Sequence, residues 1–349
     1  MDVGMIQTSL LKWYDSGRRD LPWRKDTDPY RVWVSEIMLQ QTRVETVIPY
    51  YLRFVEAVPS VECLAQISDE ALLKLWEGLG YYRRAANLKK AAVQVIQQYA
   101  GRLPGDVSEL RRLPGIGLYT AGAIASIAFG RPVPAADGNV FRIMARLKGL
   151  EESIDDSILR KKLTSELSSW IPSNRPGDFN QALMDLGATI CLPNGMPLCQ
   201  KCPLCGQCRA YEQGKTSEIP RRTERKARKV QRKTFFLIFL DEKLALQRRV
   251  EGSLLENLWE PPGIEGWPDE ADCLHMLRKW GITAANIEPL PSAKHVFTHL
   301  EWHMHAFRIA PVQNKEPERW VWVTAEDLAA RYPVPAAFRY YLDLPGLWR

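Results

Sequence analysis

The chain contains 349 residues, of which 46% are hydrophobic and 25% are charged, and it carries a formal net charge of +6 at pH 7. This length allows two domains, each with its own core. No stretch reaches the roughly 18 apolar residues that a membrane span needs, and the first residues lack the basic-then-apolar pattern of a signal peptide, so we expect a cytoplasmic protein. The mild positive charge suits a polyanionic partner and suits an ordinary basic enzyme equally well.

Residues 1–212 have a helical pattern almost throughout. Apolar residues in 33–44 follow the spacing of a helix face, and Pro49 lies too deep for one straight helix, so we predict two helices that meet near Pro49. Ser68 is a typical N-cap for the next helix, and 85–101 predicts a further helix that ends at a glycine.

Residues 113–120 read Leu-Pro-Gly-Ile-Gly-Leu-Tyr-Thr and lead into a helix of small residues. Glycines at 115 and 117 accept backbone conformations that other residues resist, so successive N–H groups can face outward beside the positive end of the helix. A DNA phosphate fits such a site, and a plain helix–helix corner packed in a core fits the spacing equally well. In either case the small residues permit close helix packing; they are Ala121, Ala123, Ala125 and Ser126.

Two carboxylates stand out. Asp137 directly precedes an amphipathic segment, where aspartate is a favoured N-cap and where the helix dipole would keep it ionised. Glu36 lies among apolar residues, which predicts a raised pKa and a bound proton at neutral pH, although a lone glutamate in a helix commonly lies on the exposed face. Such a pair suits hydrolysis of an N-glycosidic bond, since one acid protonates the departing base and one carboxylate stabilises the sugar cation. The two residues are about a hundred positions apart, and sequence alone does not bring them together.

Five of the seven cysteines crowd into residues 191–208. This distribution indicates a metal site, iron–sulfur or zinc, rather than a disulfide framework. By spacing alone, the last four form a repeated Cys-x-x-Cys pattern. The five are Cys191, Cys199, Cys202, Cys205 and Cys208.

The segment 213–232 separates the helical region from a second part of mixed α and β character, 233–349. Eight basic residues and one acid lie between Arg221 and Lys233; such a run is typical of a solvated linker and is also compatible with one that follows a phosphate backbone. In the second part we predict a hairpin turning at 241–243, a helix at 271–281, and strands at 299–310 and 319–324.

Several segments together resemble the helix-hairpin-helix DNA glycosylases and, within them, the MutY-type adenine DNA glycosylases. The resemblance covers about the first 210 residues, and its segments are SEIMLQQTRVETVIPYY, LWEGLGYYRRAANL, LPGIGLYTAGAI, DGNVFRIMARL and FNQALMDLGATIC. It implies an all-α helix-hairpin-helix catalytic region over 1–212, with an iron–sulfur cluster loop at 191–208. After the basic linker, it implies a C-terminal α+β Nudix-like domain over 233–349.

The resemblance also implies roles for individual residues. Glu36 would protonate the adenine, and Asp137 would stabilise the cation, supported by Tyr119 and Asn139. Gln181 matches a position at the adenine pocket. In related glycosylase/lyases the position of Tyr119 is a lysine that forms a Schiff base, which tyrosine cannot do, so we expect hydrolysis with at most weak strand cleavage.

Flipping the adenine out of the duplex requires that another side chain fill the gap. Gln41 and Tyr81 match the family's intercalating residues; core packing is the alternative for Tyr81. The other expected DNA contacts are Arg19, Arg24, Gly115 and Gly117.

For the cysteines, the resemblance implies a [4Fe–4S] cluster held by four of the five. The first two ligands are separated by seven residues, where the family usually has six, and Cys205 is then spare. The implied role is structural, with the loop presenting Lys201 and Arg209 to DNA. The implied ligands are Cys191, Cys199, Cys202 and Cys208.

In the second domain, the resemblance assigns recognition of 8-oxoguanine to a Phe-Ser-His element, which here reads Phe297, Thr298 and His299. The segment 271–282 has no run of glutamates for Mg²⁺, so we expect no phosphohydrolase activity. Four of the five histidines lie between 295 and 305; a zinc site is an alternative interpretation, although no cysteine or matching carboxylate lies nearby.

Together these features predict a monomeric DNA repair enzyme, associated with the nucleoid and with no membrane, that removes adenine paired with 8-oxoguanine or guanine in double-stranded DNA. Three alternatives remain. One is a glycosylase/lyase for oxidised pyrimidines, which Tyr119 and the Nudix-like domain oppose. Another is an iron–sulfur electron carrier that binds DNA, which the paired carboxylates oppose. The third is a non-catalytic mismatch sensor, which an activity assay would distinguish.

Overall fold

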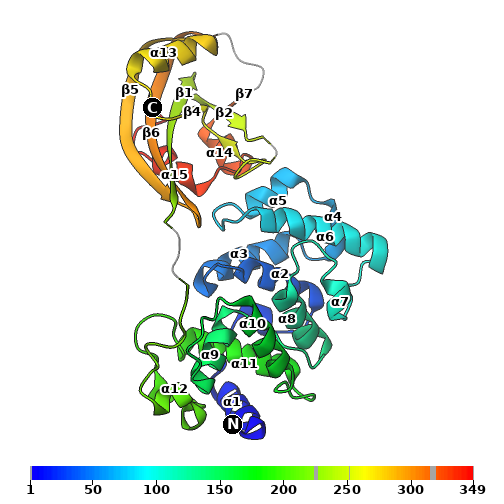
Figure 1. The fold of residues 1–349 in the computed structure, drawn as a ribbon. Helices are drawn as coiled ribbons and strands as arrows, with labels where there is room; N and C mark the ends of the chain where they lie inside the picture. Colours follow the sequence, from blue (N-terminus) through cyan, green and yellow to red (C-terminus); the bar gives the residue numbers. More distant parts are fainter. Residues whose placement is uncertain (1, 224–226, 251, 315–319, 349) are drawn as a thin grey trace. The chain divides into compact units, whose positions relative to one another are not determined.

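The computed structural model describes residues 2–223, 227–250, 252–314 and 320–348 (Figure 1). The chain forms two compact units, one of residues 1–66 and 86–224 and the other of residues 67–85 and 225–349. None of the helices in the described ranges has the length and apolar character to cross a membrane.

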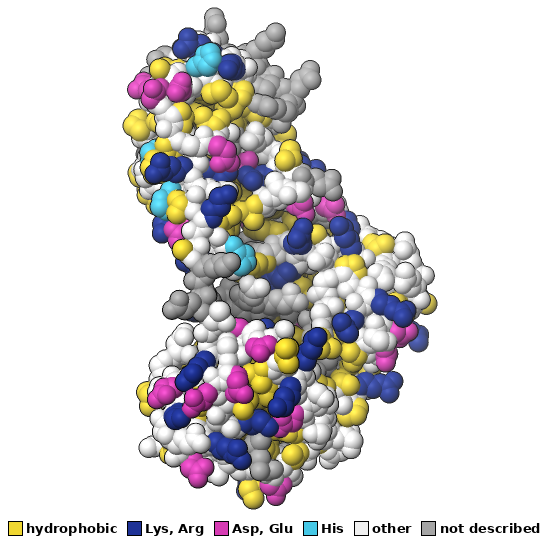
Figure 2. Space-filling model, in the orientation of Figure 1, with side chains coloured by type: hydrophobic (Ala, Val, Ile, Leu, Met, Phe, Trp, Pro, Cys, Tyr) yellow, Lys and Arg dark blue, Asp and Glu magenta, His cyan; other side chains and the backbone are white. Residues whose placement is uncertain are grey.

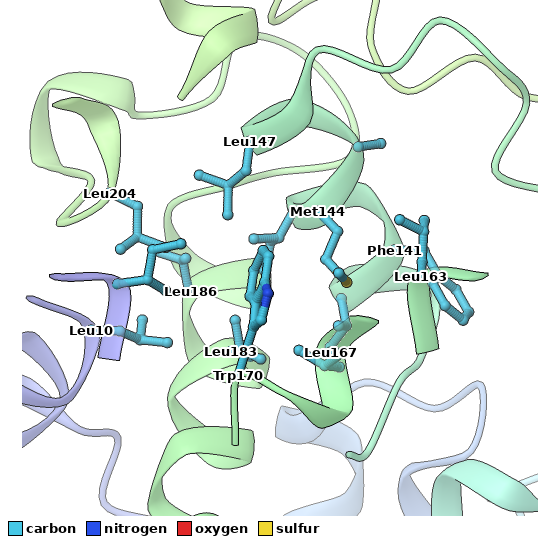
Figure 3. Packing of buried hydrophobic residues seen from close by; sticks show 14 of the residues in the cluster. Leu10, Phe141, Met144, Leu147, Leu163, Leu167, Trp170, Leu183, Leu186 and Leu204 are labelled. Carbon is cyan, nitrogen blue, oxygen red and sulfur yellow. The ribbon is translucent and has the colours of Figure 1, made fainter. Parts of the chain in front are cut away.

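The first unit is built from helices. One of its cores lies between α9, α10 and α11, where Figure 3 shows Met144, Leu167 and Leu183 around the buried Trp170. Its helices are α1 (Val3–Gly17), η1 (Pro22–Arg24), α2 (Pro29–Leu39), α3 (Val44–Ala57), α4 (Val61–Gln66), most of α6 (Arg83–Tyr99), α7 (Val107–Leu110), α8 (Leu118–Phe129), α9 (Gly138–Lys148), α10 (Ser157–Ser168), α11 (Pro176–Thr189), η2 (Cys199–Lys201), η3 (Cys205–Gln207) and α12 (Arg209–Glu212).

The helix boundaries follow local signals with one exception. Ser68 caps α5 (Asp69–Leu75) by accepting from the Ala71 N–H at 3.1 Å, as predicted, and the helix predicted within 85–101 is α6. The predicted junction near Pro49 is wrong, because α3 continues through Pro49. The break between the two helices lies before α3, at residues 40–43, where Gln41 adopts a positive φ of 58° that is incompatible with a continuing α-helix.

The small residues of α8 allow the chain segment before α9 to lie directly on this helix. A Cβ atom at Gly122 would come within 2.1 Å of the Pro134 carbonyl oxygen. The buried Asn180 on α11 fixes the same segment, since its Oδ1 accepts from the Ala135 N–H at 3.0 Å and its Nδ2 donates to the Val133 carbonyl at 2.9 Å. These contacts set the position at which α9 begins, with Asp137 as its N-cap.

The second unit contains a seven-stranded mixed sheet. The central strand β1 pairs in parallel with β6 and antiparallel with β2 and β4. Because β1 begins at Lys229, residues 229–232 of the expected linker belong to a strand, and 224–226 lie outside the described residues. The strands are β1 (Lys229–Leu240), β2 (Lys243–Arg248), β3 (Trp259–Glu260), β4 (Gly263–Glu265), β5 (Ile282–Val296), β6 (Leu300–Asn314) and β7 (Trp320–Val323).

Strand alternation buries both faces of this sheet. Phe235 and Leu237 face a core that includes residues of α14 (Ala325–Ala330) and α15 (Ala336–Leu342), whereas Phe236 and Ile238 face a core that includes α13 (Glu270–Lys279). The predicted hairpin is confirmed: β1 and β2 are joined through Asp241 and Glu242, with φ of 47° and 62°. The predicted helix is α13, and the two predicted strands correspond to β6 and β7.

The division into units differs from the expected boundary at one place. Residues 67–85, expected within the region 1–212, group with the C-terminal domain. Contacts of the Glu77 carboxylate contribute to this grouping, since it accepts from the Val334 N–H at 3.1 Å and from the Arg339 guanidinium at 2.7 Å.

On one face of the molecule the basic side chains are not gathered into a patch. On the face shown in Figure 2, Lys and Arg side chains are distributed among Asp and Glu rather than gathered in one area. On that face, phosphate binding would therefore depend on local groups such as backbone N–H donors and individual side chains.

Candidate active site

An open cavity of about 170 Å³ lies in the first unit. It brings together side chains from six helical segments, η1, α2, α3, α8, α9 and α11, including Glu36 on α2 and Asp137 at the start of α9. The two carboxylates, about a hundred positions apart in sequence, therefore share one compartment. The other predicted residues along its wall are Arg19, Arg24, Tyr119, Asn139 and Gln181.

Glu36 is buried, with 4% of its surface exposed, so the interpretation as a surface glutamate is wrong. Its Oε2 atom has no hydrogen-bond partner among the described residues. Burial raises the pKa of Glu36 to about 7, with the Tyr119 hydroxyl lowering it, Asp137 raising it and Arg24 lowering it. A substantial fraction of Glu36 is thus protonated at neutral pH, as its apolar sequence environment predicts.

Asp137 is the N-cap of α9 and is fixed by three hydrogen bonds. Its Oδ1 accepts from the backbone N–H groups of Asn139 and Val140, each at 2.9 Å, and its Oδ2 accepts from Asn139 Nδ2 at 2.7 Å. Burial nevertheless raises the pKa of Asp137 above its ordinary value, and these hydrogen bonds and Arg142 oppose the rise. The backbone N–H groups at the helix N-terminus favour the ionised form, as expected, but desolvation has the larger effect on this pKa.

Tyr119 is held as a neutral phenol. Burial, followed by the charges of Glu36 and Asp137, raises its pKa well above the ordinary value of 10. Its hydroxyl also lies 3.8 Å from Met184 Sδ. Tyr119 can therefore donate a hydrogen bond within the cavity, but it supplies neither an amine nor a phenolate.

Arg142 connects this site to the cysteine loop, a connection that the sequence analysis missed. Its Nη2 donates to Asn139 Oδ1 at 2.9 Å and to the Gly187 carbonyl at 2.8 Å, and its Nε donates to the Cys191 carbonyl at 2.8 Å. Arg142 is 2% exposed. The available signal was its spacing in the helix, three residues after Asn139.

A second cavity in the first unit is lined by all five clustered cysteines and by apolar side chains such as Leu186 and Leu204. Burial raises the pKa of Cys202 to about 12 and also raises the pKa values of Cys199 and Cys208. A bound cation would therefore be needed to hold them as thiolates. Hydrogen-bond donors face four of the sulfurs: Arg146 Nη1 at Cys191 (3.2 Å), the Thr216 side chain at Cys199, the Leu204 N–H at Cys202 and the Tyr211 N–H at Cys208.

Arg19 and Arg24, expected as DNA contacts, are engaged with a buried acid that the sequence analysis did not single out. Both guanidinium groups bind Asp185, at 2.6 and 2.8 Å, and only 25% and 10% of the two arginine side chains is exposed. They lie at the cavity wall. Asp185 lies four residues after Gln181 on α11, and this helical spacing was the available signal.

The hairpin before α8 uses its two glycines differently. Gly115 has a φ of 81°, and a Cβ there would approach Asn87 to 3.0 Å, so this position requires glycine. Gly117 has an ordinary φ of −86° and open space around it, which corrects the expectation that both glycines serve backbone conformation. Gly117 is the N-cap of α8 without a side chain to cap the helix, and both glycines are exposed.

Gln41 and Tyr81 share an unusual backbone conformation. Both are exposed non-glycine residues with positive φ, 58° and 50°, and such strain is concentrated at functional positions. Tyr81 is 45% exposed, so the alternative of core packing is wrong for it, whereas Tyr82 is buried at 7%. The Arg84 guanidinium lies 5.4 Å from the centre of the Tyr81 ring.

The residues 297–299 form the turn between β5 and β6. Phe297 packs edge-on against Trp302 at 4.9 Å, and the Thr298 hydroxyl lies 2.7 Å from the Tyr81 hydroxyl within the second unit. The nearby histidines contact different groups, since His303 lies 3.4 Å from Glu301 and His305 stacks on Trp267. Among the described residues, no three His, Cys, Asp or Glu side chains are placed to hold one shared metal ion; this does not bear on a [4Fe–4S] cluster, in which each thiolate would bind a separate iron.

Comparison with known proteins identifies both parts of the chain. Residues 34–169 match the HhH-GPD superfamily of base excision DNA repair proteins, and residues 234–344 match the NUDIX domain. Among solved structures, a thermostable thymine-DNA glycosylase has a TM-score of 0.56 at 31% identity and covers 60% of this chain and 97% of its own. A non-covalent endonuclease III–DNA complex has a TM-score of 0.52 at 25% identity, covering 61% of this chain and 98% of its own.

Curated relatives extend over nearly the whole sequence. The chain is 34% identical to the adenine DNA glycosylase of Mus musculus, over 98% of this chain and 79% of the relative. It is 32% identical to that of Homo sapiens, over 97% and 74%, and 34% identical to that of Buchnera aphidicola subsp. Schizaphis graminum, over 87% of each. These similarities confirm the resemblance found in the sequence, and the chain belongs to the adenine DNA glycosylase family.

Proposed function

We propose that the chain removes adenine paired with 8-oxoguanine, or with guanine, from double-stranded DNA, using Glu36 as the proton donor and Asp137 as the stabilising anion. Family membership makes it a base excision repair hydrolase of N-glycosidic bonds. The observation that carries the residue assignment is the buried Glu36, with a pKa of about 7, in the same cavity as Asp137.

The chemistry follows from the two environments. A departing neutral base needs a proton, which the protonated Glu36 can give, and the sugar then carries positive charge at C1′. Asp137, held by hydrogen bonds to its charged form, would face that cation, with Asn139 keeping its orientation. Water adds to C1′, and the proton released from the water restores the acid.

The environment of Tyr119 supports hydrolysis over the glycosylase/lyase alternative. A lyase of this kind needs an amine that forms a Schiff base with the sugar. The partly buried phenol at this position cannot form one, so strand cleavage would require a separate treatment such as alkali. Gln181, on the same cavity wall, is the proposed contact for the extruded adenine.

We further propose a [4Fe–4S] cluster held by Cys191, Cys199, Cys202 and Cys208. Hydrogen-bond donors are directed at these four sulfurs, as is common for thiolate ligands of clusters. When bound, the cluster would cross-link the loop 191–208. Replacing Cys205 by Ser should leave the iron content and visible absorption unchanged, whereas Cys191→Ser should reduce both. The reverse result would show that Cys205, and not Cys191, is the fourth ligand.

For binding, we propose that the duplex is held by the exposed hairpin glycines and probed by Gln41 and Tyr81. The turn 297–299 would read the base opposite the adenine. In this proposal residues 1–212 supply catalysis and the domain from 233 supplies lesion recognition. The protein would act as a monomer associated with DNA in the nucleoid.

Excision from three duplexes tests the proposal. Each carries one pair, adenine with 8-oxoguanine, adenine with thymine, or an oxidised thymine with adenine, and strand breaks are measured with and without alkali. We expect alkali-dependent breaks at the adenine opposite 8-oxoguanine. Breaks only at the oxidised thymine would reject the proposal, and Glu36→Gln should abolish turnover while duplex binding survives.

A further inference from the structure

Asp185 is an unusual acid for a helix that lines an active-site cavity. Only 1% of its surface is exposed. Its carboxylate accepts from Arg24 at two positions, Nη1 at 2.8 Å and Nη2 at 3.0 Å, and from Arg19 Nε at 2.6 Å. The backbone N–H of Arg19 also points to it, at 3.3 Å.

One carboxylate thus holds two guanidinium groups at the cavity wall, and together the three side chains carry one net positive charge. Arg24 is the member of this group that acts on Glu36. Its other contacts keep it in place, since it donates to the Arg19 carbonyl at 3.3 Å and lies 5.7 Å from the centre of the Tyr14 ring. The remaining groups that face Glu36 are the Tyr119 hydroxyl from α8 and the Asp137 carboxylate from the start of α9.

We propose that Asp185 is a positioning residue for the excision reaction: by fixing both ends of the Arg24 guanidinium, it prevents Arg24 from forming an ion pair with Glu36. The inference rests on the proposed role of Glu36 as proton donor. Without Asp185, Arg24 would carry an uncompensated charge in a buried wall, and the carboxyl of Glu36 would be an available partner. An ion pair with Arg24 would keep Glu36 deprotonated and so remove the acid.

Removing the charge of Asp185 and removing the charge of Arg24 should shift the pH dependence of excision in opposite directions. The full-length protein is assayed under single-turnover conditions across pH, on a duplex with adenine opposite 8-oxoguanine. In Asp185→Asn the decline of the rate should move to lower pH by about one unit, because the positive charge near Glu36 is no longer compensated. In Arg24→Gln it should move to higher pH, because a group that lowers the pKa of Glu36 is removed.

Arg24→Lys is the matched control, since it keeps the charge and loses the two-pronged geometry. We expect the excision rate of Arg24→Lys to fall at a pH close to that of the wild type. The pH shift should be smaller than the shift in Arg24→Gln. Purely structural damage would lower the rate without moving the two profiles in opposite directions. Circular dichroism and binding to an uncleavable duplex are measured for each variant, and if Asp185→Asn does not fold, Asp185→Ser, which also removes the charge, takes its place.

The inference is overturned if Asp185→Asn and Arg24→Gln shift the profile in the same direction, or if neither shifts it. Glu36→Gln separates this failure from failure of the proposed function. If Glu36→Gln still excises adenine, the assignment of the acid is wrong. If it is inactive while the Asp185 and Arg24 variants show no shift, only the positioning role is rejected.

Discussion

At Glu36, burial and three neighbouring groups place the pKa at about 7, and this predicts how excision depends on pH. The protonated form is the proposed active form, so the single-turnover rate should be nearly constant below about pH 6 and half-maximal near pH 7. Above it, the rate should fall about tenfold per pH unit as the proton is lost. The measurement is the excision rate from pH 5.5 to 9 with enzyme in excess over the duplex.

Tyr119→Phe tests the same pKa, that of Glu36, from the side of its hydrogen-bond partner. The Tyr119 hydroxyl lowers the pKa of Glu36 through its hydrogen bond, so removing it should raise that pKa and move the decline to higher pH. A decline that begins near pH 5, close to the ordinary glutamate pKa, would contradict the assignment of Glu36 as a buried acid.

Asn139 offers a prediction about Asp137. Its side chain supplies the hydrogen bond to Asp137 Oδ2 at 2.7 Å and receives one from Arg142 at 2.9 Å. Asn139→Ala removes a hydrogen bond to a charged group, worth about 1.5–3 kcal/mol, so we expect excision to slow by about tenfold to a hundredfold. Asn139→Asp should be at least as harmful, since it places a second negative charge beside the first. Duplex affinity is measured in parallel and should change little in either variant.

At the scale of helices and strands, the sequence was informative where the signal is local. Ser68 and Asp137 are N-caps, and the turn at Asp241 and Glu242 joins two strands, as predicted. Pro49 was misleading, because the packing of α3 outweighs the loss of one backbone donor. Asp185 was missed because its importance depends on Arg19 and Arg24, which only the folded chain brings to it.

The contact between α8 and the segment before α9 carries a prediction about Gly122. A Cβ there would lie 2.1 Å from the Pro134 carbonyl oxygen, so Gly122→Ala must displace the backbone that leads to Asp137. We expect a loss of about 1–3 kcal/mol in the free energy of unfolding, measured by thermal or denaturant unfolding, together with slower excision. Gly17→Ala is the matched control, because nothing lies within 4 Å of a Cβ at that position. Equal stability of the two variants would contradict the close contact.

At the scale of the molecule, the cavity is assembled from segments spread over most of the first unit. Glu36 and Asp137 reach it from α2 and α9, and Gln181 reaches it from α11. The resemblance predicted which residue types belong there, since each lies within a quoted motif. It did not predict the electrostatic balance, because the pKa of Asp137 depends on how deeply the folded chain buries it.

The grouping of 67–85 with the C-terminal domain leads to the last prediction. Within the second unit, Glu77 is 11% exposed at its side chain and pairs with Lys74 at 2.6 Å and Arg339 at 2.7 Å, while also accepting from the Val334 N–H. Glu77→Gln removes the charge from this partly buried group, and hydrogen bonds to charged groups contribute about 1.5–3 kcal/mol. We therefore expect amide hydrogen exchange around Val334 to become about tenfold to a hundredfold faster. Glu70→Gln is the control, because Glu70 pairs with Arg248 at 3.4 Å with both side chains largely exposed, and such pairs contribute little. Faster exchange in both variants, or in neither, would show that Glu77 does not hold this segment in place.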